Sequence, residues 1–183
     1  AGEFESTGGR KARALAAVRD ARYAVGIEIT RHHIGMVLTD MTETVLKYER
    51  TRKPFVCEDE YFKQLGEALD EFLGDDGTVK EKIAGVGISV PSIVDGTANR
   101  ITYSRALNLY DIDGDVFSRY IPYPCVLLND ANAAAVTECI ADSQLESMIY
   151  LSLSNTVGGA VVFRQDPARE DASGALNSVC ENK

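Results

Sequence analysis

Three short segments near the start of the chain alternate between apolar and polar residues. In "YAVGIEIT", Tyr23, Val25, Ile27 and Ile29 occupy every second position, which is the spacing of side chains on one face of a β-strand. "HIGMVLTDM" and "TVLKYERTR" follow, and a polar turn around Thr42 separates them. Since a short polar turn joins antiparallel neighbours, the pattern predicts a three-stranded meander.

The apolar spacing changes from two to three and four between Glu58 and Leu73. An amphipathic helix buries one such stripe along its length. The chain then reaches Gly74 and the turn formers "GDDG", which end a helix. The sequence therefore predicts one long helix after the meander, with a buried stripe made of Tyr61, Phe62, Leu65, Leu69, Phe72 and Leu73.

The second half of the chain contains further apolar runs. "KIAGVGISVP" reads as a buried strand that Pro91 stops, and "CVLLND" reads as a strand that leads into the helical segment "ANAAAVTECIA". "SMIYLSLS" and "VGGAVVF" are predicted to form a strand–turn–strand unit. Between the first two runs, "SIVDGTANRITYSRALNLYDIDG" is rich in turn formers and is predicted to be irregular, with a short helix at 115–120 after it.

The predicted order of elements is β-β-β-α-β-α-β-α-β-β. Helical crossovers place the later strands parallel to the first, whereas the meander is antiparallel, so the sheet is mixed. The fold class is therefore α/β, with helices on the faces of the sheet. This order resembles the ribonuclease-H-like lobe of the actin/Hsp70/hexokinase superfamily, which implies a mixed five-stranded sheet flanked by helices.

Composition and charge exclude several classes of protein. Of 183 residues, 45% are hydrophobic, as in a globular core. The formal net charge of -9 argues against direct binding of nucleic acid or anionic lipid, which needs clustered Lys and Arg. The apolar runs fall short of the roughly 18 residues of a membrane-spanning helix. Scattered cysteines favour reduced thiols in a cytoplasmic protein and predict neither disulfides nor a metal site; they are Cys57, Cys125, Cys139 and Cys180.

A carboxylate lies at the junction of a predicted strand and a predicted helix, in "LLNDANAAAVTE". Asp130 there either caps the helix or meets a ligand. A side-chain oxygen near a helix N-terminus accepts backbone N–H groups and favours the positive end of the helix dipole. Ligands of open α/β sheets, however, bind outside the carboxyl ends of the strands. The local sequence leaves both readings open.

Four segments in succession resemble the ROK family of repressors, open reading frames and sugar kinases: "GVGISVPSIVDG", "ALNLYDIDG", "LLNDANAAAVTE" and "IYLSLSNTVGGAVV". The resemblance spans residues 23–163. It implies that Asp130 matches the general base of the family's kinases, within reach of a sugar hydroxyl. It also implies that Asn129 and Asn108 are sugar-binding amides, and Ser92 in the first segment is expected to bind the sugar as well.

The two segments that hold phosphate in the family's kinases depart from their pattern. Where the resemblance implies "D-I-G-G-T", this chain has "EITRH", and where it implies "G-T-G-I-G-G-G", this chain has "SNTVGGA". Bulky side chains replace glycines that would let the backbone approach phosphate. The remaining glycine pair is read as a tight turn, and no cofactor is expected. The degenerate loops comprise Glu28 and Thr30 in the first segment, and Asn155, Thr156, Gly158 and Gly159 in the second.

The basic start "ESTGGRKARAL" resembles the linker that follows a winged helix-turn-helix in the transcriptional branch of the family. Residues 1–21 are interpreted as this linker, after an absent DNA-binding domain. Residues 22–146 are expected to form the first actin-like lobe, and 147–164 the start of a second lobe. The tail, 165–183, is read either as the closing helix of the family or as an ordinary amphipathic tail.

The sequence is therefore interpreted as the sugar-sensing region of a ROK-type transcriptional repressor. The resemblance implies a small-molecule sugar effector, DNA contact only through the absent N-terminal domain, no membrane, and a homodimer in the intact protein. We expect the chain by itself to bind sugar weakly or not at all. The enzymatic alternative is a ROK sugar kinase that uses Mg-ATP, with Asp130 as base. A structural or assembly module without ligand is a third reading.

Overall fold

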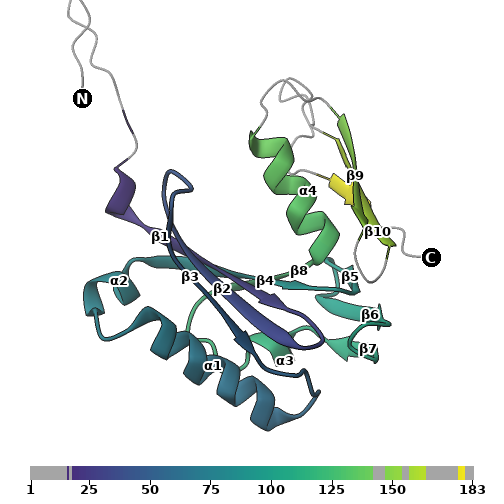
Figure 1. The fold of residues 1–183 in the computed structure, drawn as a ribbon, viewed down its shortest axis with the longest axis horizontal. Helices are drawn as coiled ribbons and strands as arrows, with labels where there is room; N and C mark the ends of the chain where they lie inside the picture. The colour runs from purple at the N-terminus through teal and green to yellow at the C-terminus, as the bar shows by residue number, and fades with distance from the viewer. Residues whose placement is uncertain (1–15, 17, 142–146, 154–156, 164–176, 180–183) are drawn as a thin grey trace, which may run out of the picture.

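The computed structural model describes residues 16, 18–141, 147–153, 157–163 and 177–179 (Figure 1). The predictions for Asn155 and Thr156 lie outside these residues. The centre of the molecule is a five-stranded sheet of order β3-β2-β1-β4-β8. Its strands are β1 (Tyr23–Ile29), β2 (His33–Asp40), β3 (Val45–Arg52), β4 (Ile83–Val90) and β8 (Cys125–Asn129).

The sheet is mixed, as predicted. β1 pairs antiparallel with β2, and β2 pairs antiparallel with β3, so the meander is confirmed. β4 lies parallel to β1 on its other side, and β8 lies parallel to β4. The carboxyl ends of β1, β4 and β8 therefore meet at one edge of the sheet, where ligands of such folds bind.

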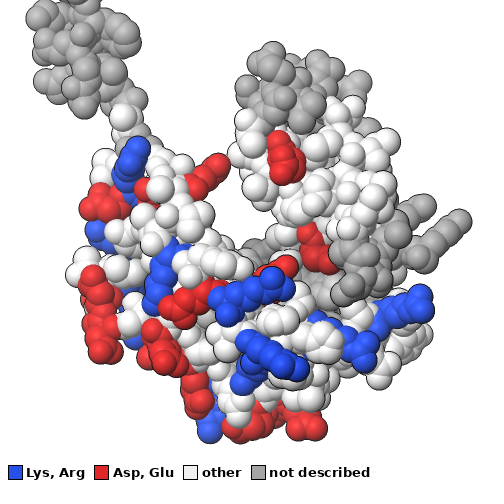
Figure 2. Space-filling view, in the orientation of Figure 1, with Lys and Arg blue, Asp and Glu red and all other residues white. Residues whose placement is uncertain are grey.

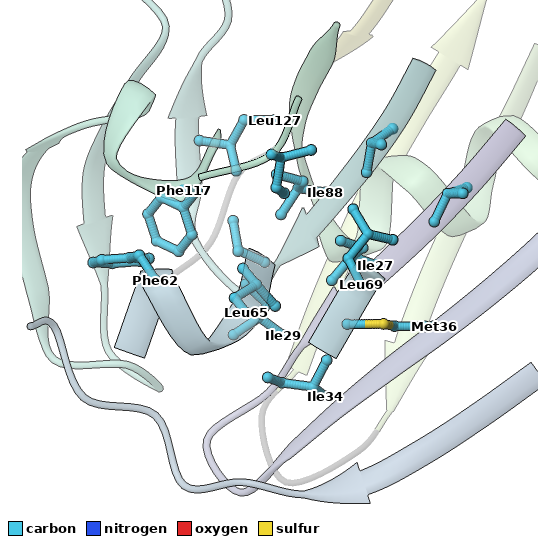
Figure 3. Close-up of a cluster of buried hydrophobic side chains, with 14 of the residues drawn as sticks. Ile27, Ile29, Ile34, Met36, Phe62, Leu65, Leu69, Ile88, Phe117 and Leu127 are labelled. Atoms are coloured by element: carbon cyan, nitrogen blue, oxygen red, sulfur yellow. The ribbon is translucent and has the colours of Figure 1, made fainter. Parts of the chain in front are cut away.

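Helix α1 (Asp59–Leu73) covers one face of this sheet. Its buried residues are the six predicted from the apolar spacing. Figure 3 shows Phe62, Leu65 and Leu69 of α1 close to strand residues such as Ile27 and Ile88. Burying an aliphatic side chain of this size stabilises a fold by about 1.5–3 kcal/mol. This layer is therefore the main source of stability.

The opposite face of the sheet carries glycines and polar residues together with exposed apolar side chains such as Tyr48 and Val126. Partners in register form one row across all the strands: Leu128, Ser89, Glu28, Gly35 and Arg50. A Cβ on Gly35 would lie 3.4 Å from Oε2 of Glu28, so the Glu28 carboxylate lies over that glycine. Gly87, by contrast, has no atom within 4 Å of its Cβ position. This face is only partly covered.

A second, smaller core involves α4 (Asp130–Ala141) and a three-stranded sheet of order β11-β10-β9. The strands are β9 (Ser147–Leu153), β10 (Val157–Phe163) and β11 (Asn177–Val179). The strand–turn–strand prediction is confirmed by the antiparallel pairing of β9 with β10. The core itself consists of Ala135, Cys139, Ala160 and Val162.

The two cores share no residue, and α4 contributes to the second one, while the predicted lobe boundary after residue 146 stays a prediction. On its other side, β9 exposes three aliphatic side chains, Ile149, Leu151 and Leu153. Of the predicted tail, the structure describes only Asn177–Val179. These residues pair with β10 as a strand and do not belong to a closing helix.

The stretch predicted to be irregular contains three short strands, so that prediction is wrong. β5 (Ile93–Asp95), β6 (Arg100–Ser104) and β7 (Leu109–Asp113) form an antiparallel sheet of order β5-β6-β7. Each of its two turns ends in an asparagine with positive φ, Asn99 at 48° and Asn108 at 53°. Asparagine tolerates this left-handed conformation better than most residues. The turn formers therefore punctuate hairpins here.

Three short helical segments complete the described chain: η1 (Arg19–Ala21), α2 (Gly77–Glu81) and α3 (Asp115–Ser118). α3 forms where a short helix was predicted. α2 was missed, because its five residues begin inside "GDDG", where Asp76 accepts the N–H of Thr78 at 2.9 Å. Phe117 of α3 packs edge-on against Phe62 of α1, with ring centroids 5.1 Å apart. α3 thereby extends the first core.

Candidate functional site

Strand alternation turns Asn129 and Asp130 to opposite sides of the sheet. Leu127 and Asn129 are buried on the side of α1, at 8% and 2% exposure. Leu128 and Asp130 belong to the exposed side. Because successive residues of a strand point to opposite faces, two adjacent polar residues acquire different surroundings. Asn129 enters the core, and Asp130 reaches the edge where strand ends meet.

Asn129 carries out the capping role considered for Asp130. Its Oδ1 accepts the backbone N–H of Asn132 at 2.9 Å, which is the N-cap bond of α4. Its Nδ2 donates to the carbonyl of Ser92 at 2.7 Å and to Oδ1 of Asp130 at 3.1 Å. Asp130 also accepts the N–H of Ala131, at 2.8 Å. The carboxylate is therefore held in place by its neighbours, and the cap itself is supplied by Asn129.

Partial burial raises the pKa of Asp130 above its usual value, and the hydrogen bonds from Ala131 and Asn129 oppose this shift. Desolvation disfavours the charged carboxylate, whereas N–H donors stabilise it. A fixed carboxylate with a raised pKa suits a group that accepts a proton or a hydrogen bond from a hydroxyl. The geometry therefore fits a ligand-binding role as well as a local structural one.

Asp130 opens onto a cleft of about 840 Å³, within the range of small-molecule sites. In Figure 2, acidic and basic side chains meet at the bottom of the notch between the sheet and the α4 side of the molecule. Two predicted site residues besides Asp130, Glu28 and Thr30, also line this cleft. Its charged lining consists of Glu28, Arg31, Arg50, Arg105 and Asp130, together with the histidines His32 and His33.

The turn between β1 and β2 is filled by its own side chains. Oγ1 of Thr30 accepts the N–H of His33 at 3.0 Å and donates to the carbonyl of the same residue at 3.0 Å. The carbonyl of Arg31 accepts the N–H of Phe55 at 3.1 Å, and that of His32 accepts the N–H of Lys53 at 2.9 Å. The turn is therefore fixed, with the side chains of Arg31 and His32 lining the cleft.

Asn108 lies in a neighbouring pocket of about 410 Å³ and does not line the cleft of Asp130. Arg31, Arg105 and Ala106 line both cavities, so the two are contiguous. Asn108 is exposed and has a φ of 53°. The structure thus brings Asp130 and Asn108 to adjoining cavities.

Ser92 is buried at 2% exposure and does not line the cleft. Its carbonyl accepts the bond from Asn129, while its Oγ has no hydrogen-bond partner among the described residues. A buried hydroxyl without a partner is unfavourable by about 1–3 kcal/mol. Ser92 therefore contacts Asn129 from within the core and does not reach the cleft.

Gly158 and Gly159 lie within β10, so the prediction that they form a tight turn is wrong. They pair with Ser152 and Leu151 of β9. A Cβ on Gly159 would lie 2.9 Å from the carbonyl oxygen of Tyr150, closer than real Cβ contacts. Glycine at position 159 is therefore explained by close strand packing.

The described part of the chain contains no group of three or more His, Cys, Asp or Glu side chains arranged to share a metal ion. None of the helices described is long and apolar enough to cross a membrane.

Comparison with known proteins identifies the family. Residues 24–173 match the model of the ROK family. The chain belongs to the ROK family. The xylose repressor of Bacillus subtilis (strain 168) is 27% identical over 170 residues, which is 88% of this chain and 43% of the repressor. A putative xylose repressor of Caldicellulosiruptor is 25% identical over 174 residues, which is 92% of this chain and 43% of that protein.

Solved structures show the same fold. A ROK family transcriptional regulator, described as a homologue of the E. coli MLC protein, has a TM-score of 0.66 at 13% identity, over 85% of this chain and 45% of that one. The ROK hexokinase of Thermus thermophilus has a TM-score of 0.63 at 22% identity, over 85% of this chain and 48% of that one. The predicted lobe of the actin and hexokinase superfamily is thereby confirmed.

This ROK chain spans less than half the length of the curated relatives named above. Sequence reasoning assigned Asp130 to the sugar pocket and Glu28 to a degenerate phosphate loop, and in the structure both line the same cleft. It missed Arg50, Arg105 and Tyr150, which line it too. Tyr150 and Arg105 carried a local signal, because Tyr150 lies in "IYLSLSNTVGGAVV" and Arg105 directly precedes "ALNLYDIDG", whereas Arg50 carried none.

Proposed function

We propose that this ROK chain is the sugar-sensing region of a transcriptional regulator, with the cleft at Asp130 as its effector site. The observation that carries the proposal is the filled turn after β1. Thr30 bonds within the turn, and Arg31 and His32 occupy its cleft side. A nucleotide phosphate would need close approach to bare backbone there, so these residues do not fit Mg-ATP. The xylose repressors among the relatives support the same reading.

In this proposal, a sugar hydroxyl donates to the Asp130 carboxylate, and exposed Asn108 contributes an amide from the adjoining pocket. Both groups suit sugar hydroxyls, since a carboxylate accepts and an amide both donates and accepts. Binding would favour one arrangement of the protein and thereby shift its equilibrium with operator DNA. With a net charge of -9, these 183 residues are poorly suited to contact DNA, and we assign that contact to another part of a homodimeric protein.

The competing function is a sugar kinase. The retained carboxylate and the raised pKa of Asp130 favour it, because a general base works best with a pKa near the operating pH. Kinases are also present among the structural neighbours. In that case Asp130 would accept the proton of the attacking sugar hydroxyl.

Calorimetric titration of the complete gene product with xylose, glucose and N-acetylglucosamine tests the proposal. We expect one sugar to bind, and Asp130→Asn to weaken that binding about tenfold or more, the value of a charge-assisted hydrogen bond. Asp75→Asn is the matched control, because Asp75 is exposed in a turn away from the cleft. A coupled assay should detect no sugar-dependent ADP formation. Turnover that disappears in Asp130→Asn would establish the kinase instead.

A further inference from the structure

The central sheet ends at β3, whose outer edge is unpaired among the described residues. β3 pairs with β2 on one side, and all eight of its residues are exposed. Two large apolar side chains lie on it, Leu46 at 50% and Tyr48 at 60% exposure. An edge strand presents a row of free N–H and C=O groups to any strand that can pair with it. β3 is therefore a surface that fits an extended partner strand.

The direction of the backbone groups follows from the pairing with β2, which is regular from Lys47 to Arg52. The N–H of Lys53, directly after this segment, donates to the carbonyl of His32 at 2.9 Å and thus points toward β2. Backbone groups alternate in direction along an antiparallel strand. Tyr48 lies an odd number of residues before Lys53, so its N–H and C=O groups both point outward, away from β2.

The charges of β3 select one way in which two copies of this edge can pair. Directly opposite residues of an antiparallel pair bond in the same direction, so a two-fold axis places one residue opposite its own copy. Four positions of the regular segment would place like charges opposite each other, which is unfavourable: Lys47, Glu49, Arg50 and Arg52. An axis at Thr51 would place Arg50 opposite Arg52 of the other copy. Tyr48 is the remaining position.

Unlike charges meet across the pair when Tyr48 lies on the axis. Lys47 of each copy is then opposite Glu49 of the other. Within one copy, Nζ of Lys47 already lies 3.0 Å from Oε1 of Glu49, and it donates to the carbonyl of Phe72 in α1. Four alternating charges therefore surround the axis on the α1 side. On the other side of the sheet the two Tyr48 rings meet, and aromatic cross-strand pairs stabilise a sheet.

We propose that β3 is a self-association surface, on which a second copy of this chain adds its own β3 antiparallel, with Tyr48 at the two-fold axis. The five-stranded sheets of the two copies then form one continuous sheet. Each Tyr48 exchanges two backbone hydrogen bonds with its copy. The inference is independent of the proposed sugar site.

Disulfide trapping in the complete gene product tests the position of the axis. Opposite residues that exchange backbone hydrogen bonds have Cα atoms about 5.5 Å apart, a separation that a disulfide spans. Tyr48→Cys should therefore form a covalent dimer on mild oxidation. Val126→Cys is the matched control, because Val126 is 58% exposed in the same cross-strand row but lies on β8, at the opposite edge of the sheet. The parent protein, with its native cysteines, gives the background.

Charge reversal tests the register. Lys47→Glu and Glu49→Lys should each weaken the dimer about tenfold, because like charges then face each other at both symmetric positions. The double variant restores unlike pairs and should recover most of the affinity. Glu81→Lys is the control, since Glu81 is exposed in α2 and the substitution changes the net charge as Glu49→Lys does. Sedimentation velocity of the complete gene product measures the affinities.

Several results would overturn the inference. One is a Tyr48→Cys protein that forms no more covalent dimer than the parent or than Val126→Cys. Another is a dimer that keeps its affinity after either charge reversal, or that the double variant fails to restore. A dimer that withstands both reversals and dissociates in Leu151→Ser would assign the contact to the exposed face of β9 instead. Circular dichroism checks that each variant is folded.

Discussion

The two faces of the five-stranded sheet differ in what they contribute. The face toward α1 is packed with aliphatic and aromatic side chains, including Ile27, Leu65 and Ile88, all at or below 1% exposure. The other face presents Gly87, Glu28 and charged residues to a partly open space. One side of the sheet therefore stabilises the lobe. The other side is free to shape a binding cleft.

Replacing either of two adjacent leucines in β8 gives the largest expected contrast between the faces. Leu127 is 8% exposed on the α1 side, whereas Leu128 is 40% exposed on the other. Leu127→Ala should lower the free energy of unfolding by about 2–4 kcal/mol, because it leaves a cavity in the core. Leu128→Ala should lower it by about 1 kcal/mol or less. Urea denaturation measures both, and equal losses would contradict the assignment of the two faces.

A pair of register partners tests how tightly the second face is packed. A Cβ on Gly26 of β1 would lie 2.8 Å from Cγ1 of Val37, whereas the Cβ position of Gly87 in β4 is open. Gly26→Ala should therefore destabilise the protein by about 1–3 kcal/mol through overpacking. Gly87→Ala should be neutral or stabilise by up to about 1 kcal/mol, since it reduces the freedom of the unfolded chain. Thermal unfolding measures the stability of both variants. A lower melting temperature for Gly87→Ala than for Gly26→Ala would contradict this difference in packing.

The smallest expected effect concerns charge at the edge of the second face. The pKa of Asp130 is raised in the folded state, so the folded protein holds the carboxyl proton more tightly than the unfolded chain does. Ionisation above the ordinary pKa of 3.8 therefore opposes folding, and this penalty is fully present at neutral pH. Asp130→Asn should be slightly more stable than the parent at pH 7.

The stability gain of Asp130→Asn should shrink as the pH falls toward 3.8. Urea midpoints across this range measure the difference. A variant that is less stable than its parent at neutral pH would mean that the hydrogen bonds of the carboxylate outweigh its desolvation.

Much of the fold could be predicted because its long elements have clear apolar periods. The alternation from Tyr23 to Ile29 and the stripe from Tyr61 to Leu73 coincide with β1 and α1. The small sheet β5-β6-β7 was missed, since its strands span only three to five residues. At that length, turn formers such as Asn99 outweigh the strand signal, and the hairpins are anchored by tertiary burial of residues such as Ile101 and Leu109.

The site was predictable only in part, for a physical reason. The sequence indicates that Asn129 and Asp130 end a strand, but which one caps the helix depends on the side to which each points. Likewise, Arg31 and Arg105 are distant in sequence, and only the folded chain places both around one cavity. The glycine at 159 had a local reading as a turn, whereas its cause is the approach of a neighbouring strand.

The outer side of β9 has a practical consequence for work with these 183 residues. Ile149, Leu151 and Leu153 are 81%, 60% and 73% exposed, on a strand at the edge of its sheet. An exposed apolar edge strand associates with other molecules, including further copies of the same chain. Samples of this chain should therefore become turbid as concentration rises, and mild detergent should keep them clear.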